Sequence, residues 1–327
     1  MKHYINKTKL FPIGAIGTSL GFMTLANVWA IHGVKFLKIP AIIFAVIAMT
    51  FMIGKIIIHP KHAYEELKNP IAGGFYPTID MAAFALAGYL LPYLPTFAKA
   101  IWLVGIVVHL SLFTFFFGLR LKNFKPRDML PSWNVVLVGV CVASVGSRGM
   151  GFPEIANFLT YFGIVLYLPF YPIMLFRVYI HNHKISIPAA STIGIMAAPS
   201  SLVLASYLTT TTVHNEFVLW YLIATSIFNV LLVYIELPKF IKQGFKAGYA
   251  AFTFPLAISM LAMWKTSVLF GKYSVAYGTF FKTISNIELA IGSLVILYVV
   301  INFIILLIKT ILEIERARDI NSYKLSK

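Results

Sequence analysis

The chain has 327 residues, of which 59% are hydrophobic and 12% are charged. Ordinary soluble domains are about 45–50% apolar and about 25% charged, so this composition excludes a water-soluble globular protein. The net charge of +16 comes from Lys and Arg scattered through loops, which indicates membrane topology rather than a surface that binds nucleic acid.

Apolar stretches of about 20 residues recur along the chain, each long enough to cross the roughly 30 Å hydrocarbon core as a helix. Cutting at Pro, Gly and charge clusters predicts an all-α membrane protein, a single domain over residues 1–327 with ten transmembrane helices in five hairpins. The helices are expected at roughly 10–31, 39–58, 71–94, 98–119, 131–147, 154–176, 185–209, 216–236, 247–270 and 285–308, before a short tail at 309–327. Ser285-x-x-Glu288 matches a capping box and predicts the start of the tenth helix.

Basic residues predict the orientation of these helices. Of the 27 Lys and Arg, 20 fall on the side that holds both termini and 7 on the other side. Cytoplasmic loops carry the excess of positive charge, so both termini of this multi-pass protein are expected in the cytoplasm and the helices in the cytoplasmic membrane.

The odd-numbered helices differ in composition from the even ones. Gly, Ala, Ser and Thr make up 9 of 20 residues over 12–31 and 11 of 20 over 188–207, but 5 of 20 over 39–58 and 3 of 20 over 289–308. Small residues let helices approach closely, so the odd helices are expected inside and the even ones against lipid. The same composition also fits tight packing with no cavity. Kinks in the odd helices are predicted at Pro12, Pro77, Pro131, Pro199 and Pro255.

Few ionisable residues lie deep within the predicted helices. Asp80 in the third is a possible proton or cation site, or the partner of a neighbouring polar group, and His109 in the fourth is a possible relay or a neutral packing residue. His181-x-His183 is expected to be solvated rather than metal-bound. We find no catalytic set, phosphate-binding loop or Cys/His cluster, so no metal, cofactor or enzymatic activity is predicted.

Four segments on odd helices resemble a known family when taken in order. They are "LFPIGAIGTSLGF" at 10–22, "PSWNVVLVGVCVAS" at 131–144, "IMAAPSSLVLASYL" at 195–208 and "AAFTFPLA" at 250–257. The chain resembles the tellurite-resistance and C4-dicarboxylate transporters, which form one superfamily of voltage-dependent anion channels with the plant guard-cell slow anion channels.

The resemblance implies a homotrimer in lipid with one pore per protomer, formed by the odd helices and surrounded by the even ones. It also implies that Phe254 plugs this pore, and that chloride, nitrate, sulfite, malate or related small anions pass. The chain departs from many relatives after Trp133, where it lacks a second proline that bends the fifth helix. It carries Pro255 where some bacterial relatives have Gly.

The ninth helix can be interpreted from its residues alone. At roughly 100° per residue, Phe252 and Phe254 point about 200° apart, and Lys265 lies on nearly the azimuth of Phe254, roughly 16 Å further out. Pro255 cannot donate to the carbonyl of Ala251 and bends the helix there. Lys265 and Arg148 are candidate cations at the outer mouth, where they would concentrate anions. The alternative is that both side chains only extend to the membrane–water interface, as basic side chains ordinarily do.

These observations favour an anion channel or channel-like anion transporter gated by Phe254. The alternative is a proton-coupled exporter of C4-dicarboxylate, sulfite or another oxyanion, using Asp80 or His109. A membrane enzyme or a scaffold without transport is the third hypothesis, which a centre filled by side chains would favour.

Overall fold

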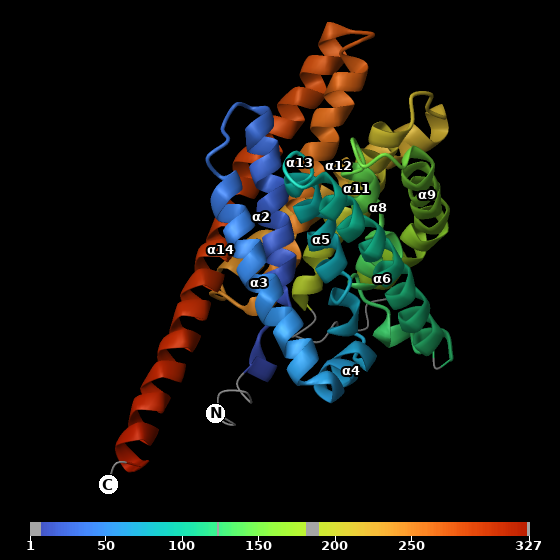
Figure 1. Cartoon of the computed structure of the whole chain (residues 1–327). Coiled ribbons are helices and arrows are strands. Elements are labelled where there is room, and N and C mark those ends of the chain that lie inside the picture. The colour runs from blue at the N-terminus through green and yellow to red at the C-terminus, as the bar shows by residue number, and fades with distance from the viewer. Residues whose placement is uncertain (1–7, 123, 181–189, 326–327) are drawn as a thin grey trace.

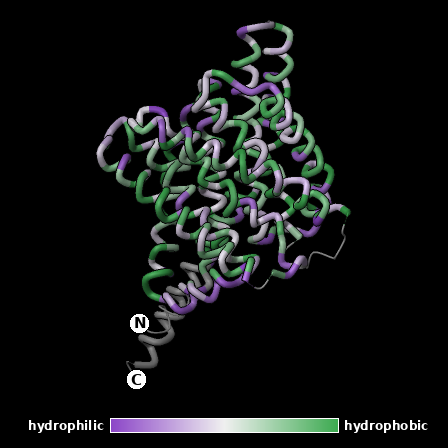
Figure 2. The backbone as a smooth tube through the Cα atoms, turned by 90° about the vertical axis from the view of Figure 1, so that its right-hand side faces the viewer, coloured by the Kyte–Doolittle hydropathy of each residue, from purple (hydrophilic) through white to green (hydrophobic). Residues whose placement is uncertain are grey.

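The computed structural model describes the backbone of residues 8–122, 124–180 and 190–325. Side chains are described for these residues up to 309, except for residues 10 and 127. Within these residues every regular element is a helix and there is no strand. The helices pack as a bundle in which α14 runs along one side and continues past the body at the end where η1 and α4 also lie (Figure 1). Hydrophobic residues extend along the length of the bundle (Figure 2).

The regular elements of the described residues are all helices. In chain order they are η1 Thr8–Leu10, α2 Gly14–Ile31, α3 Lys38–Ile58, α4 Pro60–Lys68, η2 Gly73–Phe75, α5 Thr78–Leu90, α6 Pro95–Lys122, η3 Pro126–Asp128, α7 Trp133–Val138, α8 Cys141–Val145, α9 Pro153–Leu175, η4 Phe176–Ile180, η5 Ser191–Ala197, α11 Ala198–Thr210, α12 Glu216–Ile241, η6 Ala247–Phe252, α13 Thr253–Phe270 and α14 Val275–Leu325.

Eight helices in the described chain are long and apolar enough to cross a membrane. Three of them, Gly14–Ile31, Ser191–Thr210 and Ala247–Phe270, are between 72% and 83% buried over their most apolar windows. The other five are between 28% and 39% buried. The protein is therefore an all-helical membrane protein in which the helices rich in small residues lie inside and the aliphatic ones form the surface.

The remaining two predicted spans, 71–94 and 131–147, contain shorter helices. The first holds η2 and the 13 residues of α5, and the second is divided into α7 and α8 with Gly139 and Val140 between them. The helix is divided here although the chain lacks the second proline that many relatives have after the tryptophan. An ideal Cβ on Gly139 would lie 2.2 Å from the carbonyl oxygen of Val135. Only glycine fits at this break.

The prediction that Ser285 and Glu288 form a capping box at the start of the tenth helix is wrong. Helix α14 begins ten residues earlier, at Val275, because the chain turns tightly after α13. The Ser285 hydroxyl donates to the carbonyl of Met260, and the Glu288 carboxylate accepts from Ser259 at 2.8 Å. The two side chains join α14 to α13 instead of capping a helix. Residues 185–189 of the seventh predicted span, and His181 and His183, lie outside the described residues.

The five prolines predicted as kinks lie at the starts of α-helices. Pro12 and Pro131 precede α2 and α7, and Pro77 is the residue before α5. Pro199 and Pro255 lie in the first turns of α11 and α13, directly after the 3-10 segments η5 and η6. Proline is tolerated there because a first-turn residue needs no intrahelical donor.

Helices α2 and α13 approach each other closely at Gly21 of α2. An ideal Cβ on Gly21 would lie 2.6 Å from the backbone nitrogen of Phe254 and 2.6 Å from Cβ of Thr253. The hydroxyl of Thr253 lies 3.2 Å from the carbonyl oxygen of Gly17 and 2.8 Å from that of Ala250. The start of α13 is therefore held against α2 by backbone contact and by the hydrogen bond to Gly17.

We expect Gly21→Ala to destabilise the protein by about 1–3 kcal/mol, because the added methyl group meets backbone that cannot move aside. Gly54→Ala is the matched control, since Gly54 lies inside α3 with no atom within 4 Å of its ideal Cβ. Thermal unfolding in detergent should show a lower midpoint for Gly21→Ala only. Equal midpoints for the two variants would contradict this packing.

Candidate functional site

A cavity lies inside the bundle, and its wall comes from all five segments that were predicted as odd helices. The volume of the cavity that the centre of a water molecule can occupy is about 40 Å³, which is enough for only a few water molecules. The wall consists of Gly17, Leu20, Phe75, Thr78, Met81, Asn134, Val135, Val138, Gly139, Ile195, Ala198, Pro199, Leu202, Ala250, Ala251, Phe254 and Pro255.

Five α-helices begin at this cavity. The wall includes first-turn residues of each, such as Gly17 of α2, Thr78 of α5, Val135 of α7, Pro199 of α11 and Pro255 of α13. A helix carries partial positive charge at its N-terminus, so the positive ends of these helix dipoles face the cavity. The breaks in the odd segments thus bring helix starts to the cavity.

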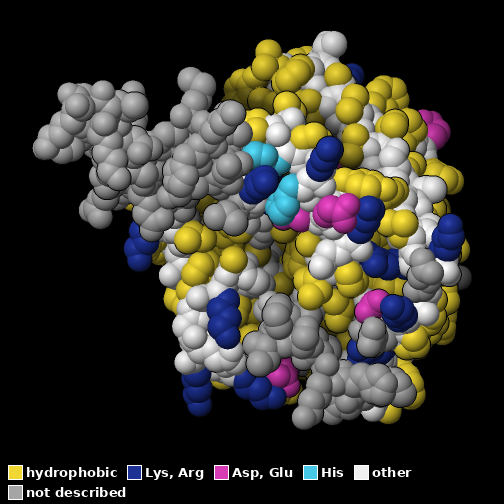
Figure 3. All heavy atoms as spheres, turned by 90° about the horizontal axis from the view of Figure 1, so that it is seen from below, with side chains coloured by type: hydrophobic (Ala, Val, Ile, Leu, Met, Phe, Trp, Pro, Cys, Tyr) yellow, Lys and Arg dark blue, Asp and Glu magenta, His cyan; other side chains and the backbone are white. Residues whose placement is uncertain are grey.

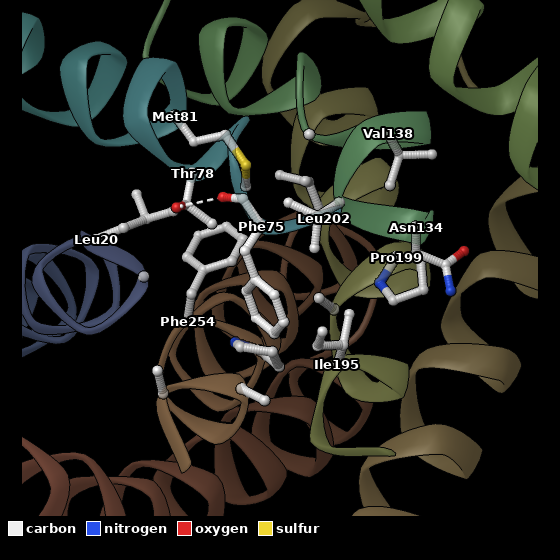
Figure 4. A pocket seen from close by; sticks show the side chains of 17 residues that line it. Leu20, Phe75, Thr78, Met81, Asn134, Val138, Ile195, Pro199, Leu202 and Phe254 are labelled. Carbon is white, nitrogen blue, oxygen red and sulfur yellow. Dashed lines mark hydrogen bonds between the residues drawn. The ribbon is translucent and has the colours of Figure 1, made fainter. Parts of the chain in front are cut away.

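Two phenylalanine rings occupy this space together. Phe254 and Phe75 point toward the same region between Leu20 and Leu202 (Figure 4). Phe254 is 7% exposed, and Phe75 is half-buried. The two rings come from segments far apart in the chain, η2 and α13, and narrow the cavity from different sides.

Few polar atoms face the cavity, and no charged side chain belongs to the wall given above. The Thr78 hydroxyl donates to the carbonyl of Phe75 at 2.7 Å (Figure 4), so its hydrogen is used locally. The Asn134 amide donates to the carbonyl of Pro131 at 3.2 Å, and its amide group points away from the two rings (Figure 4). An ion in this cavity would therefore meet apolar groups and helix dipoles rather than a counter-charge.

Phe252 faces away from the cavity, in agreement with the helical geometry. Its ring is fully buried and lies 5.2 Å from the ring of Phe240 in α12. An ideal Cβ on Gly194 of η5 would lie 2.6 Å from the Phe252 ring, so the ring fills the gap between these segments. Phe252 is a packing residue.

The comparison with known families agrees with this architecture. The sequence model of the voltage-dependent anion channel family matches residues 10–308, which include every wall residue of the cavity. The chain belongs to the voltage-dependent anion channel family. None of the curated proteins matches it in sequence. Members of the voltage-dependent anion channel family are channels or transporters of anions rather than enzymes.

Asp80 and His109 bind each other behind the cavity wall. The Nδ1 atom of His109 lies 2.6 Å from Oδ1 of Asp80, and both side chains are almost completely buried between α5 and α6. Met81, the next residue after Asp80, lines the cavity. The sequence left open whether Asp80 pairs with a polar neighbour, and the structure places it in such a pair.

The two predicted outer cations lie beyond the end of the cavity. Arg148 is exposed in the turn after α8, and Lys265 is half-buried three turns along α13. Their charges act on one another, so the two side chains share one region. Neither belongs to the cavity wall.

Sequence reasoning missed Phe75 and the role of Gly139. The motif "GGFYP" at 73–77 contains the available signal, since a glycine pair and a proline around an aromatic residue are typical of irregular backbone. It also placed Glu288 at a helix end, although this residue is 4% exposed and faces α13. A single glutamate in an apolar stretch does not reveal which neighbouring helix it contacts.

Proposed function

We propose that this protein is an anion channel or channel-like anion transporter of the cytoplasmic membrane, with a path through the cavity that Phe254 closes. The observation that carries the proposal is the cavity itself, where five helix starts surround an apolar space without counter-charge and a phenylalanine ring fills it. Weak binding of this kind lets an anion leave as well as enter.

The proposal includes an architecture of ten membrane-crossing helices in five hairpins over a single domain, 1–327. Helices α2 and α13 and the segments around α5, α7–α8 and α11 form the inner ring, and α3, α6, α9, α12 and α14 form the outer ring. The differences in burial between the two sets support this arrangement. Both termini are proposed to be cytoplasmic, and basic side chains are spread over the face at the η1 and α4 end (Figure 3).

Two further proposals rest on the family resemblance, and a third rests on the distribution of apolar and basic residues along the chain. The functional unit is a homotrimer, whose protomers contact one another and lipid through the outer helices. Small inorganic anions, dicarboxylates or other oxyanions, tellurite among them, are the candidate substrates. The residues after 309 form a cytoplasmic tail, into which α14 continues.

The gate proposal assigns the narrowest point to Phe254, with Phe75 as its neighbour. An aromatic ring blocks the path sterically, and its negatively polarised face disfavours an anion. An apolar constriction also resists filling by water, which opposes ion passage. Pro255 lies in the first turn of α13, where its fixed backbone angle favours the start of the α-helix directly after η6.

Phe254→Ala should raise anion flux severalfold in liposomes or in patch recordings, because removal of the ring widens the cavity. Phe252→Ala is the matched control, since it removes the same side chain two residues earlier from a position that packs on Phe240. Its flux should stay at the wild-type level. Unchanged flux in a correctly assembled Phe254→Ala protein would refute the gate.

Lys265→Gln should lower anion flux a few-fold at low ionic strength, and less so when an impermeant salt is added, because screening removes the attraction of the outer mouth. The exposed Lys272, in the turn that follows α13, is the control: its change to Gln should have a smaller effect. Equal effects of the two changes would indicate a general surface potential instead of a role for Lys265.

A proton-coupled exporter is the second candidate because Asp80 and His109 form a buried pair that can hold a proton. The two functions differ in driving force. In a channel, an imposed pH gradient at equal anion concentrations should cause no uphill anion accumulation once the membrane potential is clamped. Accumulation that disappears in Asp80→Asn would favour the exporter.

A further inference from the structure

The pair of Asp80 and His109 makes a third contact, to the backbone of the broken segment α7–α8. His109 uses Nδ1 toward Oδ1 of Asp80 at 2.6 Å, and its Nε2 lies 3.3 Å from the carbonyl oxygen of Val136. His109 is 1% exposed and Asp80 is 3% exposed. One imidazole therefore joins three segments, α5, α6 and α7.

Counting hydrogens shows what this chain of contacts requires. The carbonyl oxygen of Val136 can only accept, so Nε2 must carry a hydrogen to bind it. The contact between Nδ1 and Oδ1 needs a second hydrogen, on either of the two atoms. The pair thus holds two protons and is neutral overall, one proton more than a neutral imidazole beside an ionised carboxylate.

The surroundings favour this neutral form. Oδ2 of Asp80 is buried and has no hydrogen-bond partner among the described residues, so a negative charge on it would be unsolvated. Helices α2, α3, α6 and α8 pack against α5. From these elements, within the described residues, His109 is the titratable group that acts on Asp80.

The pair also touches the cavity wall from behind. An ideal Cβ on Gly139 would lie 2.8 Å from Cε1 of His109 and 2.8 Å from the sulfur of Met81. Gly139 and Met81 both line the cavity, as do Val135 and Val138 on either side of Val136. The imidazole therefore lies directly behind residues of the cavity wall at the break.

We propose that Asp80 and His109 form a proton-binding site that controls anion passage past the break between α7 and α8. With both protons bound, the pair is neutral and holds the carbonyl of Val136. Loss of one proton to water or a buffer base leaves one negative charge on the pair. The remaining proton cannot serve both contacts, so the wall loses a hydrogen bond while the new charge repels anions in the path. This inference rests on the proposed function, because it regulates that same cavity.

The test is anion flux at equal pH on both sides of the membrane, from about pH 5.5 to about pH 8.5, which brackets the ordinary range of histidine. Phe254→Ala serves as the background so that a closed gate does not hide the effect. Flux should fall at least about fivefold as the pH rises, because a unit charge about 4 Å from an anion repels it by that factor even at the dielectric constant of water. Adding Asp80→Asn should keep flux at the low-pH level throughout, because the amide stays neutral and still donates to Nδ1.

Glu288→Gln in the same background is the matched control, since it neutralises another buried carboxyl on an outer helix that does not touch the break. Its pH dependence should equal that of the background. A pH dependence that persists in Asp80→Asn, or that vanishes with Glu288→Gln, would overturn the assignment. If Phe254→Ala has no flux at any pH, the proposed function fails, and the following measurement still tests the pair.

Nitrogen-15 NMR of histidine-labelled protein gives a readout that is independent of transport, with His109→Gln to identify the signal. At low pH, Nε2 of His109 should carry a hydrogen, whether the ring is neutral or an imidazolium. At high pH the signals of His109 should change in wild type and remain constant in Asp80→Asn. A neutral ring with its hydrogen on Nδ1 at low pH would overturn the proposal.

Discussion

Backbone groups that lose their helical partners cannot be left facing hydrocarbon, and this constraint governs where the chain can be irregular. The five α-helices on the lipid-facing side run without a change of helix type over most of their length. The 3-10 segments η2, η5 and η6 and the break between α7 and α8 lie inside, where neighbouring segments surround them. Because each break starts a new α-helix, the same constraint gathers helix N-termini around one interior space.

Close packing of the inner segments depends on residues without large side chains. Gly21 lets α2 reach the backbone of α13, and Gly139 lets the α7–α8 break lie against His109 and Met81. Thr253 adds a hydrogen bond between α13 and α2. The high content of Gly, Ala, Ser and Thr in the odd segments is thus what allows interrupted helices to pack closely in the interior.

The helical membrane fold could be predicted from the sequence because length and hydropathy limit a membrane span to few solutions. The family could be predicted from four segments in order, and the family match confirms it. The start of the tenth helix could not be predicted from the sequence. Ser285 and Glu288 match a local motif, but tertiary packing gives them the partners Met260 and Ser259. The pairing of His109 with Asp80 could not be predicted either, because the two residues are 29 positions apart and lie on different helices. The gate assignment of Phe254 stays a prediction.

The contact between Gly21 and the backbone of Phe254 has a consequence for how such a path can change. Helix α13 approaches α2 through its backbone at this level, so a roll or slide of α13 would have to separate the two helices. Movement is left to rotation about the side-chain bonds of the ring. Blocked and unblocked forms would then be two rotamers within one helix arrangement, and they would exchange faster than any rearrangement of whole helices.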